Sequence, residues 1–306
     1  MVKVYSFRLV KFAPPSAGMA GGPKVALVRP FSQVDVFTDE PQRGNALAVV
    51  HHAEGLDTDQ MARFARWTNL SETCFLLPPT TEGADYRLRI FTPAEELPFA
   101  GHPTIGSAHA WLEAGGRPRD AEHVVQECGV GLVRLRRSPR LAFEAPPLLR
   151  SGPVSPGERA TVAAALAVPD DRLLDVAWID NGPGWVGALL PDAAAVLALT
   201  PDWSSFDGLE IGVVGAYPGA DVAAGEPAVE VRAFCPSLGI VEDPVTGSLN
   251  AGLAQWLIPG GRLPSAYVAS QGTCLGRAGR VHVVQDGDSI WIGGDALTAI
   301  RGEVLI

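Results

Sequence analysis

An internal repeat constrains the fold of this sequence more than any other feature. The segment IFTPAEELPFAGHPTIGSAHAWL at residues 90–112 resembles AFCPSLGIVEDPVTGSLNAGLAQWL at residues 233–257. Three pairs of positions match at an offset of 141 residues: Pro103 with Pro244, Gly106 with Gly247, and Ser107 with Ser248. Both segments predict a strand, a proline-containing loop and a helix of small and apolar residues. Because such a helix has no polar face, we expect it to be buried inside a sheet.

The length of the chain accommodates two such units. Its 306 residues leave room for two halves of roughly 140 residues each. The other predicted elements are mainly short strands, without the regular strand–helix alternation of a doubly wound parallel fold. We therefore predict an α+β protein of two pseudo-symmetric domains, each a mixed β-sheet wrapped around a central α-helix. The proline- and glycine-rich segment 146–158 marks the boundary, which gives domains at 31–147 and 148–293.

The first thirty residues differ from the rest of the chain. Residues 1–29 contain five basic residues and no acidic one, but no continuous apolar segment that would make them a secretory signal. We interpret residues 1–30 as an N-terminal extension and expect the fold to begin near Phe31. Residues 1–29 should then be dispensable for stability.

Charge and composition disfavour several classes of partner. The formal net charge of −10 argues against nucleic acid and anionic membrane surfaces, and no apolar run reaches the ~18 residues that span a bilayer. The four cysteines are far apart without a C-x-x-C pair, and the six histidines show no metal-ligand spacing. We expect a cytoplasmic protein with free thiols and no metal site.

Two polar residues stand at matched places in the repeat. Proline is favoured at the start of a helix, so we expect Pro103 and Pro244 to open the two central helices. His102 and Asp243 would then cap these helices, beside first-turn N–H groups that could bind an anion such as a substrate carboxylate. Those groups are expected near Gly106, Ser107, Gly247 and Ser248. The alternatives are structural, an N-cap carboxylate for Asp243 and a loop histidine for His102, but their matched positions favour function.

Glu72 is a third candidate. It lies in NLSETCF at residues 69–75, at the start of a predicted strand whose later residues are apolar on both faces. Partial desolvation would raise the pKa of this carboxyl toward the range useful for general acid/base catalysis. The alternative is an exposed carboxylate at the entry of a strand.

Several blocks of the sequence resemble signature segments of the PhzF-like phenazine biosynthesis family, whose members share the diaminopimelate epimerase-like fold. The blocks span residues 31–306 in the family's order and are VDVFTDEPQRGNALAVV, NLSETCF, both segments of the repeat, QGTCLGRAGRV and GGDALTAIRGEVLI. The resemblance implies two pseudo-symmetric domains with the active site between them. It further implies a last strand, within 294–306, that returns to the first domain, a homodimer, and neither metal nor organic cofactor.

The resemblance also implies roles for individual residues. The family's acid/base glutamate falls on Glu72, and the histidine of its GHP motif falls on His102. The aspartate and serine of its EDPVTGS motif fall on Asp243 and Ser248. Substrate-binding positions are expected at Asn45, Gly101, Gly106, Ser107 and Gly247. Epimerase relatives use two cysteines in the corresponding loops, but residues 99–107 and 242–250 contain none, which disfavours thiol-based racemisation.

Together these features predict a cofactor-independent isomerase that acts on a small carboxylic acid. The type reaction implied by the resemblance is isomerisation of trans-2,3-dihydro-3-hydroxyanthranilate, in which a proton leaves one ring carbon and returns at another. Alternatives are an epimerase of a different substrate and a non-catalytic protein that binds a small molecule or a partner on the same scaffold. The chain departs from the family pattern at Ala46, where proline commonly follows GN, and at Leu249, where alanine commonly follows GS. These two differences leave the substrate open.

Overall fold

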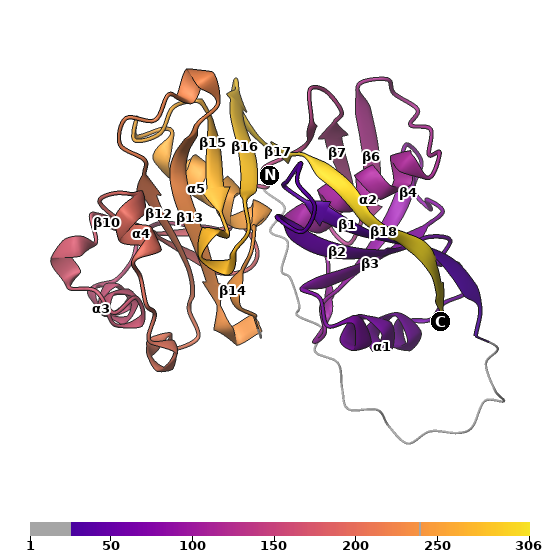
Figure 1. Cartoon of the computed structure of the whole chain (residues 1–306), viewed down its shortest axis with the longest axis horizontal. Helices are drawn as coiled ribbons and strands as arrows, with labels where there is room; N and C mark the ends of the chain where they lie inside the picture. Colours follow the sequence, from indigo (N-terminus) through magenta and orange to yellow (C-terminus); the bar gives the residue numbers. More distant parts are fainter. Residues whose placement is uncertain (1–25, 239) are drawn as a thin grey trace, which may run out of the picture.

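Two halves of like architecture lie side by side in the computed structural model, which describes residues 26–238 and 240–306 (Figure 1). The strands of the N-terminal half are β1 (Val28–Val36), β2 (Asn45–Val50), β3 (Glu72–Leu77), β4 (Tyr86–Phe91), β5 (Glu96–Leu97), β6 (His123–Cys128), β7 (Gly131–Arg136), β8 (Leu141–Glu144) and β18 (Ala296–Leu305). The strands of the C-terminal half are β9 (Arg150–Pro153), β10 (Asp175–Asp180), β11 (Trp185–Leu189), β12 (Glu210–Ala216), β13 (Pro227–Cys235), β14 (Ile240–Asp243), β15 (Ala266–Gln271), β16 (Gly279–Asp286) and β17 (Ser289–Gly294). The α-helices are α1 (Thr58–Thr68), α2 (Gly101–Glu113), α3 (Pro156–Ala165), α4 (Ala193–Leu197) and α5 (Gly247–Leu257).

The order and direction of strand pairing are the same in both halves. Along β1–β2–β3–β4–β6–β7–β8 the successive pairs are antiparallel, parallel, antiparallel, parallel, antiparallel and antiparallel. The same series of directions runs along β10–β11–β12–β13–β15–β16–β17. β5 and β14 are short antiparallel partners of β4 and β13, and the antiparallel pair β8–β17 joins the halves. The repeated topology confirms the predicted α+β fold of two pseudo-symmetric parts.

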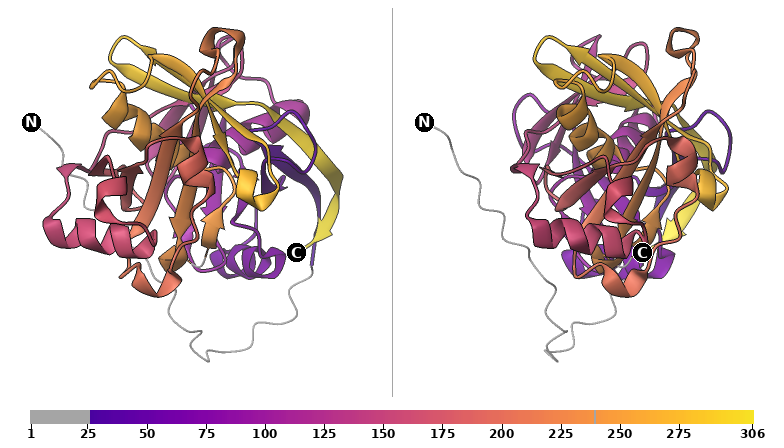
Figure 2. Two further views of the ribbon diagram at one scale, coloured as in Figure 1. Left: turned by 60° about the vertical axis from the view of Figure 1, so that its left-hand side comes forward. Right: turned by 90° about the vertical axis from the view of Figure 1, so that its left-hand side faces the viewer.

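The central helices α2 and α5 are buried, as their apolar sequences predict. Most residues of each helix are inaccessible to solvent. α2 contacts β1, β2, β3 and β8, and α5 contacts β10, β11, β16 and β17, so each helix is enclosed by the sheet of its own half. Figures 1 and 2 show both helices inside their halves. The short helix α1, started by a reciprocal capping box between Asp57 and Gln60, covers the outside of the N-terminal sheet.

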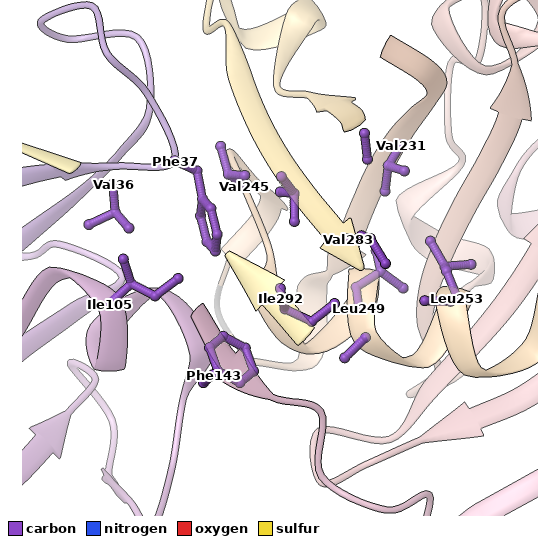
Figure 3. Packing of buried hydrophobic residues seen from close by; sticks show 14 of the residues in the cluster. Val36, Phe37, Ile105, Phe143, Val231, Val245, Leu249, Leu253, Val283 and Ile292 are labelled. Carbon is purple, nitrogen blue, oxygen red and sulfur yellow. The ribbon is translucent and has the colours of Figure 1, made fainter. Parts of the chain in front are cut away.

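One hydrophobic core extends through both halves. It includes Val36 and Ile105 of the N-terminal half and Leu249 and Ile292 of the C-terminal half. Phe143 on β8 lies between these two groups in Figure 3. The halves are therefore packed together by apolar side chains as well as by the β8–β17 hydrogen bonds.

The first strand begins earlier than the sequence predicts. Val28, Arg29 and Pro30 pair with β18, and the Arg29 guanidinium donates to the carbonyl oxygens of His52 and Glu54. The expectation that the fold begins near Phe31 is therefore wrong, because strand pairing extends to the very end of β18. The remainder of the predicted extension, residues 1–25, lies outside the described residues.

Residues 296–305 run alongside β1 (Figures 1 and 2), so the chain returns to its first strand after completing the second half. The N–H of Leu27 and the carbonyl of Ile306 form a hydrogen bond of 2.8 Å. In the described part of the chain, no helix is both long and apolar enough to cross a bilayer.

Candidate functional site

The two central helices meet end to end at a pair of glycines. α2 begins at Gly101 and α5 at Gly247. A Cβ atom on Gly101 would lie 3.1 Å from the Cα of Gly247 and 2.9 Å from the Phe143 ring. Only glycine permits so close an approach. The positive ends of both helix dipoles, with their free first-turn N–H groups, therefore converge at the interface between the halves.

The helix starts differ from the prediction that proline opens each helix. Pro103 is the third residue of α2, and Pro244 precedes α5 without belonging to it. His102 accordingly lies in the first turn of α2, whereas Asp243 is the last residue of β14 and Thr246 is the N-cap of α5. The sequence could not distinguish these positions, because proline lacks an N–H and is tolerated anywhere in the first turn of a helix.

Gly106 and Ser107 lie away from the helix start. Both are in the second turn of α2, where N–H groups are already bonded within the helix. A Cβ on Gly106 would collide with Leu47 and Val36, and the Ser107 side chain is fully buried beside Cys74. The prediction that these two residues contribute first-turn N–H groups is wrong, since they instead pack the helix against its sheet.

Glu72 and His102 face one another where β3 begins and α2 begins. Glu72 is the first residue of β3, reached from α1 through Asn69 in the left-handed conformation that ends the helix. Glu72 Oε2 lies 3.2 Å from His102 Nε2, and their side chains are only 12% and 5% exposed. Within residues 26–238 and 240–306, neither atom has an aligned hydrogen-bond partner.

Asn45 connects this pair to the other half. Its amide nitrogen lies 3.4 Å from His102 Nδ1 and donates to Asp243 Oδ1 and to the Val245 carbonyl, both at 3.0 Å. The two amide hydrogens of Asn45 therefore go to Asp243 and Val245, across the interface between the halves. The predicted residues Asn45, Glu72, His102 and Asp243 are therefore brought together by the structure.

Thr246 and Gln271 hold the turn that carries Asp243. The Thr246 hydroxyl donates to Asp243 Oδ2 at 2.5 Å. The buried amide of Gln271 donates to the Asp243 carbonyl and to the Thr246 hydroxyl, and it accepts from the Thr246 N–H and from Asn250. Sequence reasoning missed both residues, although Gln271 opens one of the resembling blocks.

Ser248 lies in the first turn of α5 with its hydroxyl fixed by Trp185. The Trp185 indole N–H donates to Ser248 Oγ at 3.0 Å, and the Asn181 amide donates to the Ser248 carbonyl at 2.8 Å. Because the hydroxyl oxygen accepts from Trp185, its own proton can be donated to another group. Trp185 and Asn181 were also missed, since nothing in the repeat marks them.

A family model described as phenazine biosynthesis-like protein matches residues 34–302.

The chain belongs to the phenazine biosynthesis-like (PhzF) family.

Three curated relatives are similar to this chain along most of their length. Antisense-enhancing sequence 1 of Schizosaccharomyces pombe is 35% identical, over 90% of this chain and 98% of that protein. The uncharacterized isomerase YddE of Salmonella typhimurium is 32% identical, over 88% and 96%. The trans-2,3-dihydro-3-hydroxyanthranilate isomerase of Pseudomonas aeruginosa is 33% identical, over 83% and 89%.

A solved structure shows the same fold. The phenazine biosynthesis protein of the PhzF family from Enterococcus faecalis superposes with a TM-score of 0.74 at 26% identity, covering 92% of this chain and all of that one. With relatives named as isomerases, this PhzF-family protein is an enzyme of the isomerase class.

Burial shifts the pKa values of the three ionisable groups in the PhzF-family site. Burial raises the pKa of Glu72 well above its usual range, and the neighbouring Asp243 carboxyl raises it further. Burial raises the pKa of Asp243 to about 6, against the lowering effect of the hydrogen bonds from Thr246 and Asn45. Burial lowers the pKa of His102 to about 3, so its imidazole is neutral at pH 7. Two adjacent carboxyls beside a neutral imidazole can exchange a proton with a bound molecule.

A metal site in a protein needs several side chains that can act as ligands close together. Among the described residues, no three His, Cys, Asp or Glu side chains are arranged as ligands.

Proposed function

We propose that this enzyme is a cofactor-independent isomerase that moves a proton on a small carboxylic acid, with Glu72 as the proton carrier. One observation carries the proposal. Glu72 Oε2 and His102 Nε2 are buried, 3.2 Å apart and unaligned with any partner in the described residues. Leaving two buried polar atoms without partners costs free energy, which a bound polar ligand would recover.

The substrate carboxylate would bind at the paired helix ends. N–H groups of Gly101 and His102 in α2 and of Gly247 and Ser248 in α5 lie in first turns and have no acceptor inside their helices. Two helix dipoles directed at one point favour an anion there. A carboxylate bound there would bring the reacting carbons next to the carboxyls of Glu72 and Asp243.

General acid/base catalysis would then proceed within the carboxyl pair. Because burial raises the pKa values of both Glu72 and Asp243, the pair keeps a proton to higher pH than two solvated carboxyls would. Glu72 would remove the proton from one substrate carbon and return it to another, while Asp243 holds the polar substituent next to the reacting carbon. The neutral His102 and the Ser248 hydroxyl would donate hydrogen bonds that position the substrate.

We propose a cyclic acid with amino or hydroxyl substituents as the substrate class. The first compound to test is trans-2,3-dihydro-3-hydroxyanthranilate, which the Pseudomonas aeruginosa relative is named for. Leu249, one of the two departures from the family pattern, packs directly over Gly212 in the core. The space that leucine needs beyond alanine is therefore provided by Gly212 of β12, which has no side chain.

We also propose a homodimer in the cytoplasm. The family resemblance supports the dimer. The four free cysteines, two of them buried, suit a reducing compartment.

The decisive test is the activity of the Glu72→Gln variant on trans-2,3-dihydro-3-hydroxyanthranilate. Glutamine keeps the shape of the side chain but cannot accept a proton, so turnover should fall by ~10²–10⁴-fold. Binding, measured by calorimetry, should change much less. Solvent deuterium incorporation into the substrate, followed by NMR, reports the proton transfer directly.

Glu230→Gln is the matched control. Glu230 is likewise buried on a strand, but it lies on β13 and accepts from the Tyr217 hydroxyl. It should leave turnover within about threefold of the unchanged enzyme. Deuterium exchange at an unchanged rate in Glu72→Gln would make Glu72 a structural residue.

A further inference from the structure

A second buried glutamate occupies the place in the C-terminal half that Glu72 occupies in the N-terminal half. Glu210 is the first residue of β12 and pairs with Trp185 in parallel register, as Glu72 is the first residue of β3 and pairs with Leu47. The next residues, Ile211 and Thr73, pair with Phe234 and Phe91 in the two halves. Glu210 and Glu72 are thus equivalent by register on both neighbouring strands.

Glu210 is buried inside the C-terminal half. Its side chain is only 3% exposed, it accepts a hydrogen bond from the Ser237 hydroxyl, and its Oε2 has no partner in the described residues. The charges of Asp243, Glu210 and Glu72 all raise the pKa of the Cys235 thiol on β13. Glu210 takes no part in the hydrogen bonds of Asp243, and its link to the candidate site is the bond from Ser237.

The partner of Glu210 belongs to the turn that leads to Asp243. Ser237 lies in the 3-10 turn Pro236–Leu238, between β13 and β14. Asp243 pairs with Ala233 ten positions before it, whereas the equivalent Leu97 pairs with Ile90 only seven positions before it. The turn of the C-terminal half is therefore three residues longer and needs more contacts to be held in one conformation.

We propose that Glu210 is a positioning residue for Asp243. By accepting a hydrogen bond from the Ser237 hydroxyl, it connects the turn to β12. This contact would hold the Asp243 carboxyl in position beside Glu72. At the base of the same hairpin, Arg232 and Glu242 form a two-bond ion pair that fixes the other end of the turn. The catalytic part of this inference rests on the proposed function, but the positioning part does not.

Protonation bears on this contact. Burial raises the pKa of Glu210 to about 7, and the Ser237 hydrogen bond opposes that shift. The group in contact with it is the Ser237 hydroxyl, and its charge also acts on the Cys235 thiol, as do the charges of Asp243 and Glu72. A carboxylate is a stronger acceptor than a carboxylic acid, so the contact is tightest above pH 7.

The test combines hydrogen–deuterium exchange with kinetics on full-length protein. The free energy that a hydrogen bond to a charged group contributes corresponds to a change of about 10–100-fold in an equilibrium constant, here the equilibrium for opening of the turn. In Glu210→Ala and in Ser237→Ala, amide exchange of the peptide 236–243 should accelerate by about that factor. On trans-2,3-dihydro-3-hydroxyanthranilate, kcat should fall about tenfold with little change in KM. Glu210→Gln retains an acceptor for Ser237. Its exchange rate and its kcat should therefore lie within about threefold of those of the unchanged protein, and the exchange rate should not depend on pH around 7.

The control is Glu230→Ala. Glu230 is a buried residue in the first half of β13, away from the turn, and its carboxyl accepts a hydrogen bond from the Tyr217 hydroxyl. This variant should not accelerate exchange in 236–243. If Glu210→Ala does not fold, Ser237→Ala, which removes a single oxygen, answers the same question. Unchanged exchange of 236–243 in Ser237→Ala, or equal acceleration in Glu230→Ala, would overturn the proposal. If neither the unchanged protein nor any variant turns over trans-2,3-dihydro-3-hydroxyanthranilate, the proposed function fails. The exchange data would still decide whether Glu210 positions the turn.

Discussion

Equivalent positions of the two halves carry different side chains where the halves meet. The second residue is His102 in α2 and Ser248 in α5. The last residue is Leu97 in β5 and Asp243 in β14, each paired with an equivalent residue of the longer strand beside it. The repeated frame thus brings two helix ends and two hairpins together, and the substitutions between them make one asymmetric site. Exact symmetry would put the same side chain at both equivalent positions, whereas this site combines two carboxyls with a neutral imidazole.

The hairpins themselves differ in how deeply their ion pairs are buried. In both halves an arginine donates two hydrogen bonds to a glutamate across the hairpin, Arg89 to Glu96 and Arg232 to Glu242. The side chains of the first pair are 24% and 34% exposed, and those of the second are 6% and 9% exposed. The hairpin that carries the candidate catalytic residue is therefore the one that is buried more completely.

The largest effect is expected from removing the asymmetry of the hairpin ends. Asp243→Asn keeps the size of the side chain but not its charge, so turnover of trans-2,3-dihydro-3-hydroxyanthranilate should fall by ~10²–10⁴-fold. Leu97→Asn changes the equivalent residue of the other half and should alter turnover by less than about tenfold. Steady-state kinetics measure both; equal losses would show that the two hairpins contribute alike.

The second comparison concerns the two ion pairs. Arg232→Met leaves the buried Glu242 charge unpaired, and it should lower the free energy of unfolding by about 3–5 kcal/mol. Arg89→Met breaks the more exposed pair, where solvent screens the charges, and should cost about 1 kcal/mol or less. Urea denaturation of both variants measures the difference, and similar losses would contradict the role assigned to burial.

A smaller effect is expected where the helix ends touch. In Gly247→Ala the new Cβ would lie 3.2 Å from both the Gly101 Cα and the Phe143 ring. This overpacking should lower the free energy of unfolding by about 1–3 kcal/mol and reduce turnover by separating the helix ends. Gly157→Ala, in the first turn of α3, is the control, because its Cβ would meet no atom closer than 4.0 Å. Thermal unfolding of the two variants should differ accordingly.

The smallest effect concerns the pH dependence contributed by Glu210. Burial raises its pKa from 4.5 to about 7, so the folded protein binds more protons than the unfolded protein between these values. The stability that Glu210 contributes therefore falls as the pH rises through this window. Glu210→Gln lacks this loss and should gain about 1–2 kcal/mol relative to the unchanged protein between pH 5 and pH 8, measured by urea denaturation. A constant difference between the two proteins across that range would contradict the raised pKa.

Much of the fold could be predicted from the sequence, because apolar periodicity reports burial directly. Two helices without a polar face indicated central, enclosed helices, and the repeat indicated two similar halves. The sequence did not show where those helices begin, since a glycine or a proline fits several places in a first turn. As a result, the offset of 141 residues matched Gly106 with Gly247, whereas Gly101 is the glycine that meets Gly247.

The site was only partly predictable. Glu72, His102, Asp243 and Asn45 come together as expected from the blocks of similar sequence. Their supporting residues were missed because their contacts bridge distant parts of the chain, as Trp185 does with Ser248 across 63 positions. Glu210 was missed for a related reason, since only strand register reveals its equivalence to Glu72.

The pairing of the outermost strands has a consequence for how the chain can be divided. In chain order, β1–β9 form one repeat and β10–β18 the other. β9, the last strand of the first repeat, pairs with the first strand of the second, and β18, the last strand of the second, pairs with the first strand of the first. Each repeat thus donates its final strand to its neighbour, as two subunits do in a domain-swapped dimer. Neither repeat, excised at the connection between β9 and β10, would contain a complete sheet. A single backbone cleavage there would leave two fragments that remain interlocked through the strands they exchange.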